Sequence, residues 1–72
     1  MKLRITNDVV KKYSEMFNRT EQEAFSNIIN GKVRRYSIFT VDNAELEIDE
    51  EKGIKSIKTA DGKLEEFGEV IL

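Results

Sequence analysis

Polar and apolar residues alternate with two different periods, and the change of period divides the chain into two halves. Over residues 8–17 the apolar positions recur at helical spacing, and Asn7 stands where it can cap the first amides. A second helix is predicted to begin after Thr20, which forms a T-x-x-E capping box with Glu23, and to end at Gly31. The apolar residues of the two predicted helices are Val9, Val10, Tyr13, Met16, Phe17, Ala24, Phe25, Ile28 and Ile29.

From residue 32 onward the period becomes two, which is typical of strands, and turn residues recur at 42–43, 51–53 and 61–62. This half predicts a meander of three or four antiparallel strands. If residues 42–43 form a two-residue turn, Phe39 lies opposite Leu46 and one face of the first hairpin is apolar. The opposite face then pairs Thr40, Ile38, Tyr36 and Arg34 with Glu45, Glu47, Asp49 and Glu51, in that order.

Together these elements predict an α+β fold within a single small domain, residues 1–72. Two short helices near the N-terminus pack on one face of a three- to four-stranded antiparallel meander, and residues 1–6 add a short strand or an extended arm. Ile54 and Ile57 differ in parity, so either a bulge separates them or one lies outside the core. Residues 70–72 are apolar and are expected to dock on their own chain or on a second copy. The predicted core of the sheet is Phe39, Val41, Ala44, Leu46, Ile48 and Ile57.

Composition limits the size of the core and the ways of stabilising it. The chain has 72 residues, 39% of them hydrophobic, with a net charge of −2 and no Cys, His, Pro or Trp. A domain of this size buries only about 60–65% of the surface of its unfolded chain. Because no disulfide or thiolate metal site can assist folding, a homodimer is one route to further buried area.

The charge is unevenly distributed along the chain. Residues 1–36 carry eight basic and four acidic side chains, a net +4, and residues 37–72 carry four basic and ten acidic ones, a net −6. Such polarity can steer a charged partner. No stretch resembles a membrane span of roughly 20 apolar residues, and charges interrupt every apolar run near the start, so no secretory signal is predicted. We expect a cytoplasmic protein.

The inventory of catalytic groups is thin, because the chain lacks both imidazole and thiol. Glu45 and Glu47 would project from one strand face about 7 Å apart, a separation that inverting glycosidases use, but a solvated strand face is the commoner meaning of such a pair. The acidic segment 42–51 lacks the glycine of an EF-hand loop, and no phosphate-binding glycine loop is present. We therefore expect no enzymatic activity, no cofactor and no metal site.

Binding of another protein is the function that remains. In the predicted register Tyr36 and Ile38 form a small apolar anchor on the outer face of the sheet, unless other parts of the chain cover them. The predicted interface consists of Arg34, Tyr36, Ile38, Glu45, Glu47 and Asp49. Its acidic rim favours a basic protein partner, and the chain is expected to be a small regulator, an inhibitor or an accessory protein of a phage or mobile element.

The alternative function is weak binding of nucleic acid through the basic first half of the chain. The two predicted helices have a tight connection that resembles a helix-turn-helix, but Glu21 and Glu23 at the start of the second helix would face phosphate. The contacts in this alternative are Lys11, Lys12, Lys32, Arg34 and Arg35.

Overall fold

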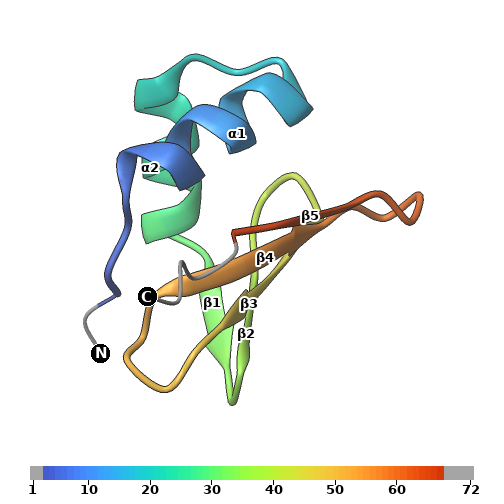
Figure 1. The fold of residues 1–72 in the computed structure, drawn as a ribbon. Helices are drawn as coiled ribbons and strands as arrows, with labels where there is room; N and C mark the ends of the chain where they lie inside the picture. The colour runs from blue at the N-terminus through green and yellow to red at the C-terminus, as the bar shows by residue number, and fades with distance from the viewer. Residues whose placement is uncertain (1–2, 68–72) are drawn as a thin grey trace.

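The structure, a computed structural model, describes residues 3–67 of the chain. Two helices lie together on one side of an antiparallel sheet (Figure 1). Each strand pairs with its neighbours in chain order, so the sheet is a five-stranded meander. The predicted α+β class is confirmed, with five strands in place of three to four. The elements are α1 (Asn7–Phe17), α2 (Glu21–Ile29), β1 (Lys32–Arg34), β2 (Ser37–Phe39), β3 (Glu45–Ile48), β4 (Ile54–Lys58) and β5 (Leu64–Glu66).

Helix α1 begins one residue earlier than predicted. Thr6, and not Asn7, is the N-cap, and its hydroxyl accepts a hydrogen bond from the amide of Val9 at 3.4 Å. The helix ends at Phe17, and the C-cap residue Asn18 has a φ of 53°, in the left-handed region that ends many helices. Its buried apolar face consists of Val9, Val10 and Tyr13, and Met16 and Phe17 are partly buried beside it.

Helix α2 has the predicted capping box. The hydroxyl of Thr20 accepts from the amide of Glu23 at 3.1 Å, and the carboxylate of Glu23 accepts from the amide of Thr20 at 3.0 Å. Ile28 is fully buried, whereas Phe25 and Ile29 are 48% and 50% exposed, contrary to prediction. Residues one position apart on a helix point about 100° apart, so Ile29 lies on a flank of α2 when Ile28 faces the sheet. Among the described residues, neither helix has the length and hydrophobicity of a membrane span.

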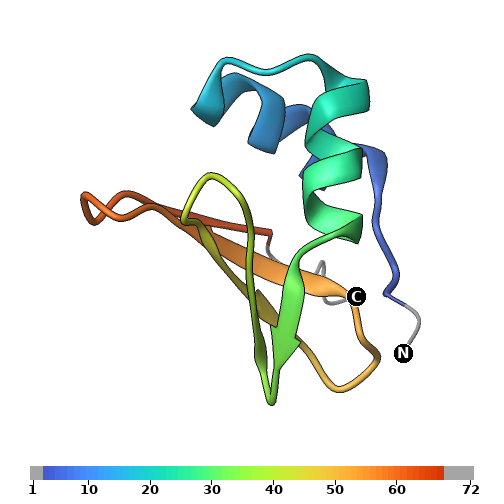
Figure 2. The ribbon, with the colours of Figure 1, turned by 180° about the vertical axis from the view of Figure 1, so that it is seen from behind.

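The register between β2 and β3 differs from the prediction by one residue. Ile38 lies opposite Leu46, and Phe39 lies opposite Glu45. The loop contains three residues, Val41 to Asn43, between Thr40 and Ala44, whose backbones are joined by a hydrogen bond of 3.3 Å. Asn43 has a φ of 59°, as three-residue hairpin loops require at their last position. The prediction of a two-residue turn at residues 42–43 is therefore wrong. Figure 2 shows the β2–β3 loop extending from the sheet toward the helices.

This one-residue shift exchanges the two faces of β2, because side chains alternate along a strand. Ile38 is fully buried, whereas Phe39 and Val41, which were predicted to be in the core, are 41% and 70% exposed. The prediction that Ile38 lies on the outer face beside Tyr36 is wrong for the same reason. The sheet residues of the core are Ile38, Ala44, Leu46, Ile48, Ile54 and Ile57.

A further hairpin accounts for the additional strand. The first strand of the predicted hairpin ran without a break from Arg34 to Val41, but Arg35 and Tyr36 form a turn that separates β1 from β2. Arg35 adopts a φ of 48° without the glycine or asparagine that usually marks such a position. Arg34 consequently pairs with Ser37, and the predicted pairing of Arg34 with Glu51 is not formed.

Strands β3 and β4 contain the bulge that the parity of Ile54 and Ile57 allowed. The register shifts between Glu47 and Ile48, so both isoleucines are buried, at 7% and 0% exposure. The N-terminal segment forms a single bridge of Arg4 to Gly53 where a short strand was considered. The predicted docking of residues 70–72 lies outside the described residues.

Candidate functional site

The outer face of the sheet, which points away from the helices, carries two rows of side chains that run across all five strands. The register places Phe39 beside Glu45 in one row and Ser37 beside Glu47 in the other. On the inner face a single row runs from Val33 to Glu65 beneath the helices. The two outer rows, from β1 to β5, are Lys32, Phe39, Glu45, Lys58 and Leu64, and Arg34, Ser37, Glu47, Ser56 and Glu66.

The charge of this face is mixed and not predominantly acidic. Its two rows contain three basic and three acidic residues. Glu45 lies opposite Lys58, and the carboxylate of Glu47 lies 3.4 Å from the ammonium group of Lys55. Both glutamates of β3 therefore have a basic neighbour within the chain. The acidic rim that was expected to attract a basic partner is largely compensated.

The β1 end of the same face carries cations and aromatic rings together. Tyr36 is 68% exposed in the turn and Phe39 is 41% exposed on β2. The guanidinium carbon of Arg34 lies 5.4 Å from the centre of the Phe39 ring, and that of Arg35 lies 5.9 Å from the centre of the Tyr36 ring. At exposed sites such cation–π contacts contribute about 0.5–1 kcal/mol each. Each aromatic ring thus has the guanidinium group of a neighbouring arginine over it.

We call these residues the hairpin surface: Lys32, Arg34, Arg35, Tyr36 and Phe39. Within residues 3–67, none of its three cations forms an ion pair. All five side chains are exposed, and all come from an eight-residue segment. The surface therefore offers positive charge and apolar area with little internal compensation.

The predicted protein interface is only partly brought together by the fold. Arg34 and Tyr36 share the hairpin surface, but Ile38 is in the core. Asp49 instead holds the turn before β4, because its carboxylate accepts hydrogen bonds from the amides of Gly53 at 2.8 Å and Glu51 at 2.9 Å. These bonds lower the pKa of Asp49.

The guanidinium group of Arg4 adds an ion pair to this turn, at 3.7 Å from the carboxylate of Asp49 and 3.9 Å from that of Glu51. The partner of Glu51 is thus Arg4, where Arg34 had been expected. Asp49 and Glu51 thus stabilise the β3–β4 connection, and Asp49 does not lie with Arg34 and Tyr36 on the hairpin surface.

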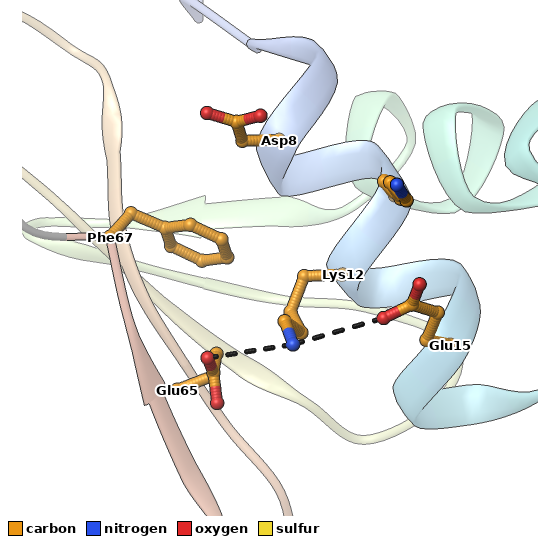
Figure 3. Close-up of a pocket in the computed structure, with 6 residues that line it drawn as sticks. Asp8, Lys12, Glu15, Glu65 and Phe67 are labelled. Atoms are coloured by element: carbon orange, nitrogen blue, oxygen red, sulfur yellow. Dashed lines mark ion pairs between the residues drawn. The ribbon is translucent and has the colours of Figure 1, made fainter.

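The residues of the nucleic-acid alternative do not form one patch either. The ammonium group of Lys12 lies 3.8 Å from Glu15 and 3.7 Å from Glu65, which belongs to the β5 edge of the sheet (Figure 3). Lys32 belongs to the opposite edge strand, β1. The depression between α1 and β5 is lined by the ion-paired side chains together with Asp8, Lys11 and Phe67, and it is open to solvent (Figure 3). Within the described residues, no three His, Cys, Asp or Glu side chains converge as metal ligands.

A partly buried polar cluster at Asp42 was not foreseen. Its carboxylate accepts hydrogen bonds from the Tyr13 hydroxyl at 2.6 Å, from Arg19 at 2.6 Å and from the Asn27 amide at 3.0 Å. The Tyr13 hydroxyl also lies 2.9 Å from that of Thr40. The Asp42 side chain is only 7% exposed, so its bonds to Tyr13 and Asn27 are partly shielded from water, whereas the bond to Arg19 lies at the surface. The cluster joins the β2–β3 loop to both helices.

The same contacts set the ionisation of the cluster. Burial alone would raise the pKa of Asp42, but the hydrogen bonds from Arg19, Tyr13 and Asn27 outweigh it and hold the pKa below its usual value. Burial and the adjacent carboxylate raise the pKa of Tyr13 to about 12. The only sequence signal for this cluster was that a buried tyrosine hydroxyl needs a partner.

No protein-family model, curated protein or solved structure matches this chain.

Proposed function

We propose that this chain is a non-enzymatic protein-interaction module and that the hairpin surface is its binding site. The observation that carries the proposal is the stacking of Arg34 on Phe39 and of Arg35 on Tyr36, with both rings exposed. Tyrosine and arginine are among the residue types that most often dominate the binding energy of protein interfaces. Because the stacks restrict these side chains in advance, less conformational entropy is lost when a partner binds.

The expected partner is an acidic protein segment. Lys32, Arg34 and Arg35 are uncompensated among the described residues, whereas Glu45 and Glu47 lie next to lysines of the same chain. This reverses the sign of the partner charge expected from the sequence, because each glutamate of β3 lies next to a lysine in the folded sheet. A role as a small cytoplasmic regulator is part of the proposal.

Site-specific photo-cross-linking tests the proposal. A photoreactive phenylalanine analogue is placed at Tyr36, and in a control at Leu64, which is 55% exposed at the far edge of the same face. Each variant is irradiated in an extract of the source organism. We expect an acidic protein to be captured from position 36 only, and to be lost when Arg34 and Arg35 are both replaced by Glu. Capture of the same proteins from both positions, or capture that survives the charge reversal, would contradict the proposal.

Binding of single-stranded nucleic acid is the second candidate, because aromatic rings between arginines also resemble a stacking platform for bases. Fluorescence titration with oligothymidylate and oligouridylate at 50 and 200 mM salt separates the two. Micromolar binding that falls steeply with salt, and that Tyr36→Ala weakens, would favour nucleic acid. The protein-binding function predicts no such binding.

A further inference from the structure

The strand β1 (Lys32–Arg34) ends the sheet on one side, and its free edge lies directly beside the cations of the hairpin surface. We infer that this edge binds an extended acidic peptide as a sixth strand, with acidic, apolar and acidic residues opposite Lys32, Val33 and Arg34. The inference rests on the proposed function and names the class of ligand and its mode of binding.

The backbone of β1 is paired with another strand on one side only, among the described residues. Among residues 3–67, β1 pairs with β2 only, and the one isolated bridge of the fold involves Arg4 and Gly53. In an antiparallel ladder every second residue directs its amide and carbonyl away from its neighbour, so part of the β1 backbone is unpaired toward this edge. An extended peptide can satisfy these groups by strand addition.

The side chains of β1 specify what the added strand would carry. Lys32 and Arg34 end the two outer rows, so the residues opposite them on a sixth strand point to the outer face as well. Carboxylates in those two positions would form the favourable cross-strand pairs that the cations lack within the described residues. Val33 ends the inner row and is half-buried, so an apolar residue opposite it would extend the core by one position.

The chain itself contains a strand with this pattern. In β3, Glu45 and Glu47 point outward and Leu46, which is fully buried, points inward. The register shows that a strand of alternating acidic and apolar residues fits this sheet with its acidic side outward.

Charge disfavours the pairing of this edge with the same edge of a second copy. An antiparallel pairing of two β1 strands about Val33 would place Lys32 of each copy opposite Arg34 of the other. Like charges directly across a ladder are destabilising. The edge is therefore better matched to an acidic peptide than to itself.

The test uses a fluorescein-labelled seven-residue peptide that alternates glutamate and valine, and follows its anisotropy with the purified protein. A peptide of the same composition with its glutamates grouped at one end is the matched control for charge. Two further peptides carry N-methyl groups on alternate amides, so that each is blocked along one edge only. We expect micromolar binding of the parent, at least tenfold weaker binding of the grouped peptide, and at least tenfold weaker binding of one N-methylated peptide but not of the other.

A charge swap locates the site. In the double variant Lys32→Glu and Arg34→Glu, the glutamate peptide should lose at least tenfold in affinity, and a peptide that alternates lysine and valine should gain at least tenfold. Circular dichroism checks that this exposed double substitution leaves the fold intact. The single variant Lys58→Glu, in the same outer row but on β4, should leave the affinity within about twofold.

Three results would overturn the inference. Equal binding of both N-methylated peptides would show attraction by charge without strand pairing, and it would leave the proposed function standing if the cross-link from position 36 persists. Unchanged affinities in the charge-swapped variant would place the peptide elsewhere. Tighter binding of oligothymidylate than of the peptide at the same salt would make nucleic acid the ligand of this surface.

Discussion

The hydroxyl of Tyr13 donates a 2.6 Å hydrogen bond to the carboxylate of Asp42, which links the buried face of α1 to the β2–β3 loop. Tyr13 is fully buried, and Asp42 receives two further donors from the helical layer. A polar contact thus holds the helical layer to the sheet at one end of the core of this small two-layer fold.

Removal of this contact should lower stability without changing the fold. Tyr13→Phe keeps the ring and deletes the hydroxyl, and we expect a loss of roughly 1.5–3 kcal/mol in the free energy of unfolding, because the acceptor is charged and shielded. Asp42→Ala should cost more, since it leaves several donors without their acceptor. Urea denaturation measures both. Glu50→Ala, an exposed acidic residue, is the control and should change stability by less than about 0.5 kcal/mol.

The pKa shifts of this pair predict loss of stability at both ends of the pH scale. The pKa of Asp42 is lower in the folded protein than in the unfolded chain, so its contribution is present above the ordinary value of 3.8 and is lost as the pH falls through and below it. The pKa of Tyr13 rises from 10.0 to about 12 on folding. Its contribution is therefore complete below pH 10 and is lost between pH 10 and about 12.

Urea denaturation as a function of pH checks both limits, and absorbance near 295 nm follows the tyrosines directly. Tyr13→Phe isolates the alkaline limit, because it removes this group and leaves the lysines and Tyr36 in place. If the difference in stability between wild type and variant stayed constant from pH 9 to 12, Tyr13 would not be the group responsible.

The register predicts that alanine substitutions at two neighbouring residues of β2 lower the free energy of unfolding by very different amounts. Ile38→Ala should cost about 2–5 kcal/mol, because it leaves a cavity between Leu46 and the helices, and Ile38→Val should cost about 0.5–1.5 kcal/mol. Phe39→Ala on the outer face should cost about 1 kcal/mol or less. Thermal melts and urea denaturation measure the order. A larger loss from Phe39→Ala than from Ile38→Ala would support the two-residue turn instead.

The backbone of Arg35 predicts a gain in stability together with a loss of binding. Its φ of 48° is unfavourable for a residue with a side chain, so Arg35→Gly should be stabilising by a few tenths to about 1 kcal/mol. It should also weaken binding at the hairpin surface, because a cation is removed. Lys52→Gly is a matched control, since Lys52 has a φ of 65° but lies in the β3–β4 connection. It should show the same gain in stability with unchanged binding.

The features that were predicted from sequence depend on residues close together in the chain. Thr20 and Glu23 are three positions apart and define the start of α2, and the parity of Ile54 and Ile57 was sufficient to suggest a bulge. The register of β2 depended on whether the loop contained two residues or three, a difference that only the left-handed backbone of Asn43 decides. One residue of loop length then decided which face of β2 entered the core.

In the candidate site, too, the features that depend on residues close together in the chain were easier to predict than those that depend on distant residues. The fold places Arg34 and Tyr36 near each other because Tyr36 belongs to the turn that follows Arg34. Ile38 was predicted at the position that Phe39 takes on the outer face, because the register differs by one residue. The hairpin itself was missed because Arg35 and Tyr36 are not typical turn residues. The Asp42 cluster joins residues 15 to 29 positions apart, and no local pattern indicates such contacts.

The separation of these partners also has a kinetic consequence. The three donors to Asp42 come from α1, from the connection after it and from α2, across 29, 23 and 15 positions of sequence. Contacts that close long loops tend to form late in folding, after the helices and hairpins. We therefore expect Tyr13→Phe to leave the refolding rate nearly unchanged and to accelerate unfolding by roughly tenfold or more. The bonds to Asp42 therefore slow unfolding of the native state more than they accelerate its formation.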